Sequence, residues 1–200
     1  AIVLGSTIDS HASGILGLVN QRMADVAGFV RKRTGFRLHD VKPHWFHTPG
    51  WANTIGFKLT NPIASVMSYW ELIIRLGDRE FVTSHATTSA FLDRMVAYPG
   101  GIIQDTVVRV WIDNQLSKGE IQIGEDVARL DNVSANLLAI AGGDDTLVTP
   151  GAAKRVMDHV SSTDKTFRVV PGGHMGILAG SKAPRQSWLE LADWLAFRSD

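Results

Sequence analysis

The stretch from Asn136 to Gly176 decides the fold. It reads NLLAIAGGDDTLVTP over residues 136–150 and, after a helix-like segment, TFRVVPGGHMG over residues 166–176. Each part contains an apolar run that is typical of a buried parallel strand and that leads into a glycine-containing turn. Asp145 follows the first run and His174 follows the second. Because open α/β sheets bind their ligands beyond the carboxyl ends of the strands, both side chains are predicted to lie at one site.

These two residues have the types and the chain order of two members of a catalytic triad. In α/β-hydrolases the nucleophile comes first, the acidic residue second and the histidine third. His174 would act as the general base, and Asp145 would hold the imidazole ring in one orientation. Taken alone, either residue is better explained as part of a loop, with Asp145 ordering its own backbone. Their matching positions at strand ends, in the right order, favour the catalytic assignment.

Other carboxylates compete for the acidic position, and the nucleophile is missing. Asp144 lies in the same turn, although its alternative role is to bind water or the backbone amides of the loop. Asp9 follows the first predicted strand and could orient a histidine from a neighbouring strand, or it could cap a helix. The chain has no cysteine, and no serine stands in a G-x-S-x-G turn. This excludes as nucleophiles the serines nearest the first strand, Ser6, Ser10 and Ser13.

The rest of the chain alternates strand-like and helix-like segments, which predicts the α/β fold class with a parallel sheet. Apolar residues recur every three to four positions in the predicted helices. These helices cover residues 13–33, 62–77, 84–98, 102–116, 151–161 and a last segment from about residue 184. Asn61 before Pro62 predicts the cap and first turn of the second helix. The predicted strands cover residues 2–4, 137–141 and 166–170, with a hairpin over residues 120–130.

Residues 35–60 break the helical pattern. Prolines and glycines punctuate this segment, while bulk comes from the aromatic residues Trp45, Phe46, Trp51 and Phe57. Large aromatic side chains in an irregular segment favour a cap or lid over a core.

The predicted organisation is a partial α/β-hydrolase core with an inserted helical cap. The core covers residues 1–9 and 120–200, and the cap covers residues 10–119. Three parallel strands are few for such a core, because parallel sheets need both faces covered and both edges partnered. We therefore expect the chain to be the C-terminal part of a longer protein, with the nucleophile in a segment before Ala1.

The composition argues against several other classes of protein. Basic and acidic residues number 20 each and form no patch or tail, so we expect no nucleic-acid partner. No apolar run approaches the length of a membrane span and no signal peptide is visible, so we expect a cytoplasmic protein. The absence of cysteine excludes a thiolate metal site. Zinc-ligand types cluster at His39, Asp40, His44 and His47 without a helical i, i+4 histidine pair, so we expect neither metal nor cofactor.

With these motifs in place, the chain resembles the polyhydroxyalkanoate (PHA) synthases of the α/β-hydrolase superfamily. It looks most like the catalytic subunit of the two-subunit type. The specific agreement lies in Ile121–Gly124, Gly142-x-x-Asp145, Val148 with Pro150, Pro171–Ile177, Ser181-Lys182 and Ala192–Leu195. Weaker agreement includes Thr7–Asp9, Pro62, Asp78, Tyr98–Gly100, Asn114 and Leu116.

The resemblance implies an acyltransferase that uses thioesters. In this family a cysteine on a strand-to-helix elbow attacks a 3-hydroxyacyl-CoA, and the growing polyester passes between thiol and hydroxyl. The resemblance implies that Asp145 and His174 are catalytic, that the substrate is an acyl-CoA or ester, and that a second subunit or a homodimer is formed. The chain departs from the family by lacking the elbow cysteine, and by carrying Thr146 where a histidine often follows the catalytic aspartate.

Two alternatives remain open from the sequence. One is a serine esterase or lipase-like hydrolase whose serine elbow lies upstream. The other is a non-catalytic hydrolase-fold module that binds a partner or a polymer granule, which exposed aromatic residues in the cap would favour.

Overall fold

The computed structural model describes residues 1–60 and 62–198. The chain forms two compact units, which are described separately. Unit 1 comprises Ala1–Leu38 and Thr106–Asp200, and unit 2 comprises His39–Asp105. That residues 10–119 act as a cap over a core of residues 1–9 and 120–200 stays a prediction.

Unit 1 is built on a three-stranded parallel sheet, which confirms the predicted α/β class. The strands lie in the order β1 (Ile2–Leu4), β4 (Leu137–Gly142) and β5 (Lys165–Val170). All residues of the central strand β4 are buried. Because a central parallel strand is covered on both faces, each of its positions must be apolar or small.

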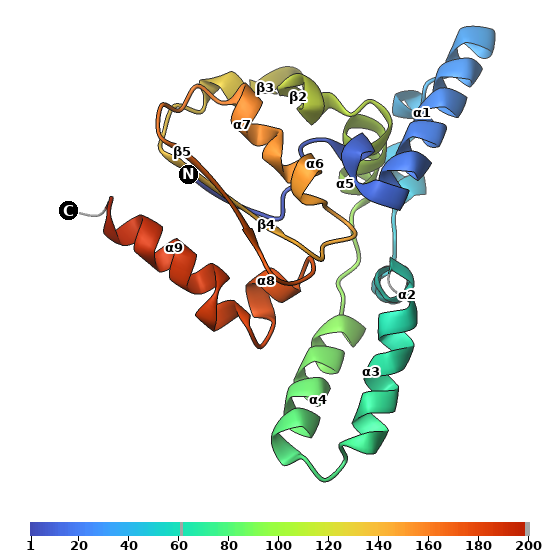
Figure 1. Cartoon of the computed structure of the whole chain (residues 1–200). Coiled ribbons are helices and arrows are strands. Elements are labelled where there is room, and N and C mark those ends of the chain that lie inside the picture. Colours follow the sequence, from blue (N-terminus) through green and yellow to red (C-terminus); the bar gives the residue numbers. More distant parts are fainter. Residues whose placement is uncertain (61, 199–200) are drawn as a thin grey trace. The chain divides into compact units, whose positions relative to one another are not determined.

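Helices cover both faces of this sheet, as Figure 1 shows. One face carries α6 (Pro150–Lys154) and α7 (Val156–His159), and the other carries α8 (Gly176–Ala179) and α9 (Ser187–Ala196). Alternate residues of a strand point to opposite faces. Leu137 and Ala139 therefore pack with Val156 of α7, whereas Leu138 and Ile140 pack with Ile177 of α8. The predicted helix over residues 151–161 is thus two short helices, and α8 has no counterpart among the predicted helices.

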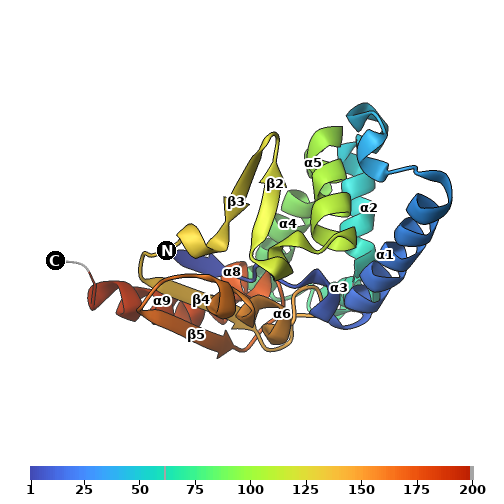
Figure 2. The ribbon, with the colours of Figure 1, turned by 90° about the horizontal axis from the view of Figure 1, so that it is seen from above.

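The other elements of unit 1 follow the first strand and precede the central one. They are α1 (Gly14–Thr34), a π-helical segment (Thr106–Ile112) and the hairpin of β2 (Glu120–Ile123) and β3 (Asp126–Arg129). α1 contacts the π-helical segment. The hairpin, whose prediction is confirmed, projects from the three-stranded sheet (Figure 2). Short 3-10 turns between the same strands of unit 1 cover Ser10–Ala12, Gln115–Lys118 and Leu130–Asn132, and one more follows α8 at Ala183–Arg185. Two others cover Leu38–Asp40, at the boundary of the two units, and Pro43–Phe46 in unit 2.

Unit 2 is helical. Its helices are α2 (Gly50–Thr60), α3 (Pro62–Ile74), α4 (Arg79–Asp93) and α5 (Gly100–Asp105). The first three contact one another. α2 is tied to the end of α4 because the Thr54 hydroxyl donates to the Leu92 carbonyl at 2.9 Å, and Lys58 lies 2.7 Å from Asp93. The hydrogen bond that Lys58 donates to Asp93 raises the pKa of Lys58.

Three predictions of helices are corrected around unit 2. Residues 50–60, predicted to be irregular, form α2, in which Trp51, Ile55 and Leu59 recur at helical spacing despite the two glycines. The helix predicted over residues 84–98 lies at Arg79–Asp93, since the Asp78 side chain caps its start by accepting from the Phe81 amide at 3.0 Å. The helix predicted over residues 102–116 is α5 followed by the π-helical segment.

The predicted cap residue Asn61 lies outside the described residues. Within the residues that the structure describes, no helix is long and apolar enough to span a membrane.

Candidate active site

Asp145 lies in the turn that follows β4, and its side chain is fully buried. The oxygen Oδ1 accepts two hydrogen bonds from its own loop, from the amides of Leu147 and Val148, each at 2.9 Å. These bonds fix the carboxylate and leave its second oxygen, Oδ2, for another partner. Asp145 therefore does order its own loop, as the alternative interpretation of the sequence predicted, but it uses only one carboxylate oxygen for this.

His174 lies in the turn that follows β5 and provides that partner. Its Nδ1 is 2.8 Å from Oδ2 of Asp145. Because an ionised carboxylate can only accept, Nδ1 carries the proton and Nε2 keeps its lone pair. Nε2 makes no hydrogen bond to the residues that the structure describes, and the side chain is one-third exposed, at 33%. The two residues that the sequence singled out as catalytic are thus in direct contact.

A close approach of two backbone turns brings these side chains together. The Asp144 amide donates to the Gly172 carbonyl at 3.1 Å, and the Gly172 amide donates to Oδ2 of Asp144 at 3.2 Å. A Cβ atom at Gly142 would lie 2.4 Å from the Gly172 carbonyl oxygen, so only glycine fits there. Gly172 itself has a φ of +126°, which L side chains rarely adopt. Gly142 and Gly172 are therefore requirements of this junction.

The end of β1 forms a third side of the site. A Cβ atom placed on Gly5 would lie 3.5 Å from both Nδ1 and Cε1 of the His174 ring. Ile177, which is almost fully buried at 1% exposure, contacts the same region, with its Cδ1 3.5 Å from that Gly5 position. The Ser187 hydroxyl donates to the Ile177 carbonyl and ties α8 to the start of α9. Gly5 and Ile177 were not predicted as site residues, although a glycine directly after a core strand is a signal that could have indicated the first.

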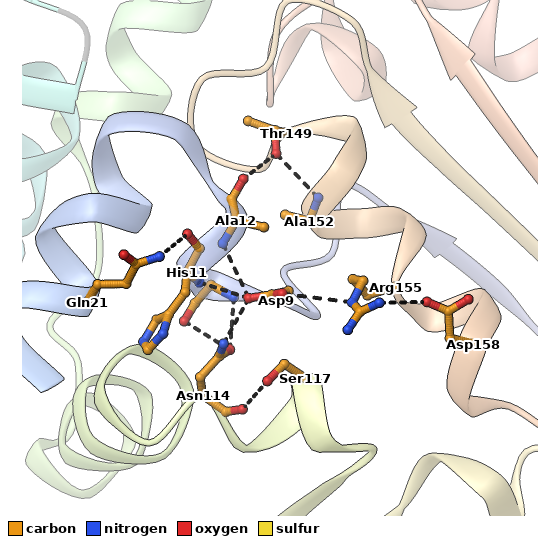
Figure 3. Close-up of polar contacts among 11 residues, drawn as sticks. Asp9, His11, Ala12, Gln21, Asn114, Ser117, Thr149, Ala152, Arg155 and Asp158 are labelled. Atoms are coloured by element: carbon orange, nitrogen blue, oxygen red, sulfur yellow. Dashed lines mark hydrogen bonds and ion pairs between the residues drawn. The ribbon is translucent and has the colours of Figure 1, made fainter.

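Asp9, the other candidate acid, is fully used by a separate network (Figure 3). Its Oδ1 accepts from the amides of His11 and Ala12 at 3.1 and 3.2 Å, which caps the 3-10 turn. The same oxygen accepts from the Asn114 side-chain amide at 2.8 Å, and Arg155 lies 3.8 Å from Oδ2. The capping role weighed for Asp9 is therefore the one found.

Asn114 joins two segments of unit 1 that are distant in the sequence by hydrogen bonds from its side chain. Its side-chain oxygen accepts from the buried Ser10 amide at 3.0 Å, while its nitrogen donates to Asp9. Asn114 has a positive φ of 47°, which asparagine tolerates better than most residues. The segment leaving the first strand is thereby joined to the segment that follows the π-helical turn. The sequence resemblance marked Asn114 only as a weak match and gave it no role.

The remaining candidates from the sequence do not form sites. Ser10 donates its hydroxyl to the Val110 carbonyl, and the Ser13 hydroxyl is buried without a hydrogen-bond partner. Neither hydroxyl is arranged as a nucleophile. Across the described residues, His39, Asp40, His44 and His47 included, no three metal-ligand side chains are grouped to hold an ion.

An α/β sheet that places a buried aspartate and a hydrogen-bonded histidine at the ends of neighbouring strands is the arrangement expected of an α/β-hydrolase-type site. Comparison with known proteins gives a more particular similarity. The chain is 27% identical to the poly(3-hydroxyalkanoate) polymerase subunit PhaC of Haloarcula marismortui over 161 residues, covering 80% of this chain and 34% of that protein. The PhaC subunit of Haloferax mediterranei is 26% identical over 73% of this chain and 30% of its own length. The predicted resemblance to PHA synthases is therefore confirmed.

Further comparisons define the extent of this similarity. The PhaC subunit of Synechocystis is 31% identical over 86 residues, which is 42% of this chain and 23% of that protein. The chain thus spans about a third or less of the length of these relatives. No family model matches the chain. Among solved structures, a monoacylglycerol lipase of Paleococcus ferrophilus aligns with a TM-score of 0.45 at 14% identity, covering 99% of this chain and 58% of the lipase.

Proposed function

We propose that this chain supplies the acidic residue and the base of a nucleophile–Asp–His triad in an acyltransferase of the PHA synthase type. The observation that carries the proposal is the 2.8 Å contact between His174 Nδ1 and the buried Oδ2 of Asp145 at the ends of neighbouring strands. The similarity to PhaC subunits supports the acyltransferase class. The nucleophile is assigned to residues outside these 200, because the chain offers neither a cysteine nor a serine elbow.

In this reaction His174 moves a single proton back and forth. As a thiol attacks the carbonyl of an acyl thioester, its proton passes to Nε2 of His174, and a sulfur–carbon bond forms. The bond between the carbonyl and the leaving thiolate then breaks, and the leaving group takes the proton from Nε2. Asp145 remains ionised throughout, holds Nδ1–H and stabilises the imidazolium that forms between the two steps. A hydroxyl that later accepts the acyl chain gives its proton to Nε2 in the same way.

The open edge of β1 is a suitable place for the strand that carries the nucleophile. β1 pairs with β4 on one side, and no strand of the described residues pairs with its other side. A parallel strand added there would lie about 4.8 Å from β1. Its final turn would come beside Gly5, where a Cβ atom would lie 3.5 Å from the His174 ring. An elbow on that strand could therefore present its side chain to Nε2.

The proposed substrate is a 3-hydroxyacyl-CoA, and the proposed partner is a second subunit or a second copy of the protein. Both follow from the similarity to proteins described as polymerase subunits for poly(3-hydroxyalkanoates). A cytoplasmic location belongs to the same proposal, since acyl-CoA thioesters would have to reach the site.

Assaying the 200-residue chain tests where the nucleophile lies. We expect no turnover of 3-hydroxybutyryl-CoA or of p-nitrophenyl esters, and clear activity would contradict the proposal. If the encoded protein extends before Ala1, its activity should fall by a factor of about 10² to 10⁴ on His174→Ala, since that is the usual contribution of a general base. Unchanged activity in that variant would exclude His174 as the base.

Two other functions are distinguished from the acyltransferase by the upstream sequence and by the His174→Ala variant. A serine instead of a cysteine in an upstream G-x-[SC]-x-G turn would indicate a hydrolase. A non-catalytic binding module is favoured by the exposure of Trp45 and Trp51, at 76% and 69%. Loss of activity in His174→Ala would argue against that module.

A further inference from the structure

We propose that Asp144 is a positioning residue that holds the His174 turn in register with Asp145. The role gains its functional meaning from the proposed function, because it matters for catalysis only if His174 is the base. Asp144 is exposed, and its carboxylate accepts from the Gly172 amide, whereas the imidazole is hydrogen-bonded to Asp145. It acts through the backbone of Gly172, two residues before the histidine.

The two turns are joined by a reciprocal pair of hydrogen bonds. The Asp144 amide donates to the Gly172 carbonyl at 3.1 Å, and the Asp144 carboxylate accepts from the Gly172 amide at 3.2 Å. The first bond uses only backbone atoms and would form with any residue except proline at position 144. The second depends on the side chain, and it is charge-assisted, which makes it stronger than a bond between neutral groups. A carboxylate at position 144 therefore adds a second hydrogen bond between the two turns.

The His174 turn needs this second connection more than the Asp145 turn does. Asp145 is held by the two amides of its own loop, those of Leu147 and Val148. His174 instead follows Gly172-Gly173, and glycine has the widest choice of backbone conformations. The bonds to both polar backbone groups of Gly172 add to the one that the Gly173 carbonyl accepts from the Ile177 amide at 3.1 Å, and together they fix the backbone that sets the direction of the His174 side chain. Asp144 thus restricts the turn whose two glycines allow the widest choice of backbone conformations.

The predicted effect of losing the Asp144 carboxylate is local. In Asp144→Ala the bond between the two backbone groups remains, but the Gly172 amide loses its acceptor. The Nδ1–H···Oδ2 bond of His174 should then open more often, and its proton should exchange with water about tenfold faster, which is the effect expected for one lost charge-assisted bond. Asp144→Asn keeps an oxygen that can accept from Gly172 and should stay within about threefold of the wild type.

The experiment is NMR on the 200-residue chain with ¹⁵N-labelled histidine. It follows the Nδ1 proton of His174, its exchange rate and the tautomer of the ring in the wild type, Asp144→Ala and Asp144→Asn. The matched control is Asp78→Ala, which likewise removes a carboxylate that accepts from a backbone amide, that of Phe81, but in unit 2. We expect faster exchange and a mixed tautomer in Asp144→Ala only.

Several results would overturn the proposal. One is an unchanged Nδ1 proton in Asp144→Ala, and another is an equal change in Asp78→Ala, which would indicate general destabilisation. A failure of Asp144→Asn to restore the signal would show that the amide acceptor is not what Asp144 provides. Because none of these readouts requires turnover, they remain informative if the proposed acyltransferase function fails.

Discussion

The substitution Gly142→Ala tests directly whether close contact between the two turns builds the Asp145–His174 pair. A Cβ atom at this position would lie 2.4 Å from the Gly172 carbonyl oxygen, 3.1 Å from Cγ2 of Ile177 and 3.3 Å from Cβ of Asp145. The first of these is backbone and the second belongs to a buried side chain, so neither can move aside freely. Gly142 does not have a positive φ, so the space around it, and not its backbone conformation, requires glycine.

The size of the effect follows from these distances. The carbonyl of Gly172 would have to retreat by about 1 Å before the new contact became an ordinary one, and overpacking of this kind costs about 1–3 kcal/mol. The same displacement would lengthen the 2.8 Å bond between His174 and Asp145 beyond hydrogen-bonding distance. For a chain of this length, a loss of 1 kcal/mol lowers the melting temperature by about 2–4 °C.

Gly143→Ala is the matched control, one residue further along the chain. A Cβ atom there would meet nothing closer than 3.7 Å, at Cγ1 of Val169 and the Val170 carbonyl. Thermal unfolding followed by circular dichroism should show a drop of several degrees for Gly142→Ala and almost none for Gly143→Ala. The His174 Nδ1 proton should be lost in the first variant and kept in the second. Equal melting temperatures together with an intact His174 signal in Gly142→Ala would refute the reasoning.

Three further predictions concern single hydrogen-bonded groups. Asn114→Ala leaves the buried Ser10 amide without its acceptor and should lower the unfolding free energy by about 1–3 kcal/mol, measured as a lower urea midpoint with an unchanged slope; an unchanged midpoint would contradict it. Asp145→Asn should preserve the fold by circular dichroism but reduce activity of a triad-complete protein by up to about 10⁴-fold, because the ring loses its fixed tautomer. The Phe81 amide and Arg75 lower the pKa of Asp78 below 3.8, so Asp78 stabilises the folded state above the unfolded-state pKa and loses this contribution as the pH falls through the folded-state pKa. The difference in melting temperature between wild type and Asp78→Ala should therefore shrink between pH 5 and pH 3, and a constant difference would argue against it.

The sequence was sufficient to predict the parallel sheet because its central strand is buried on both faces. A central strand such as Leu137–Gly142 has to be apolar at each position, and that requirement leaves an uninterrupted run that can be recognised. The same strand ends in a glycine turn, so the positions of Asp145 and His174 followed from the ends of two runs. Their contact could not be read from the sequence, since it depends on how closely Gly142 and Gly172 approach.

Unit 2 shows where sequence patterns fail. α2 was not predicted because it begins at Gly50 and contains Gly56. The interior glycine destabilises a helix by about 1 kcal/mol relative to alanine, but it does not prevent a helix that contacts two neighbouring helices. The start of α4 is fixed by Asp78, a single capping residue whose signal is weak beside the apolar pattern further along. Both errors arise because tertiary contacts and caps decide helix boundaries that propensity leaves open.

The site also explains why the Asp–His pair is easier to recognise than the residues that build it. The carboxylate of Asp145 and the imidazole of His174 have side-chain chemistry suited to catalysis, so both residues can be predicted from the sequence. Gly142, Gly172 and Asp144 act through backbone contacts, and a glycine or an exposed aspartate in a turn has many alternative explanations. Yet the 2.8 Å bond of the pair depends on those contacts, since the His174 turn is linked to the Asp145 turn through the backbone and side chain of Asp144. A chain that keeps Asp145 and His174 but replaces Gly142 should therefore retain both side chains and lose the hydrogen bond between them.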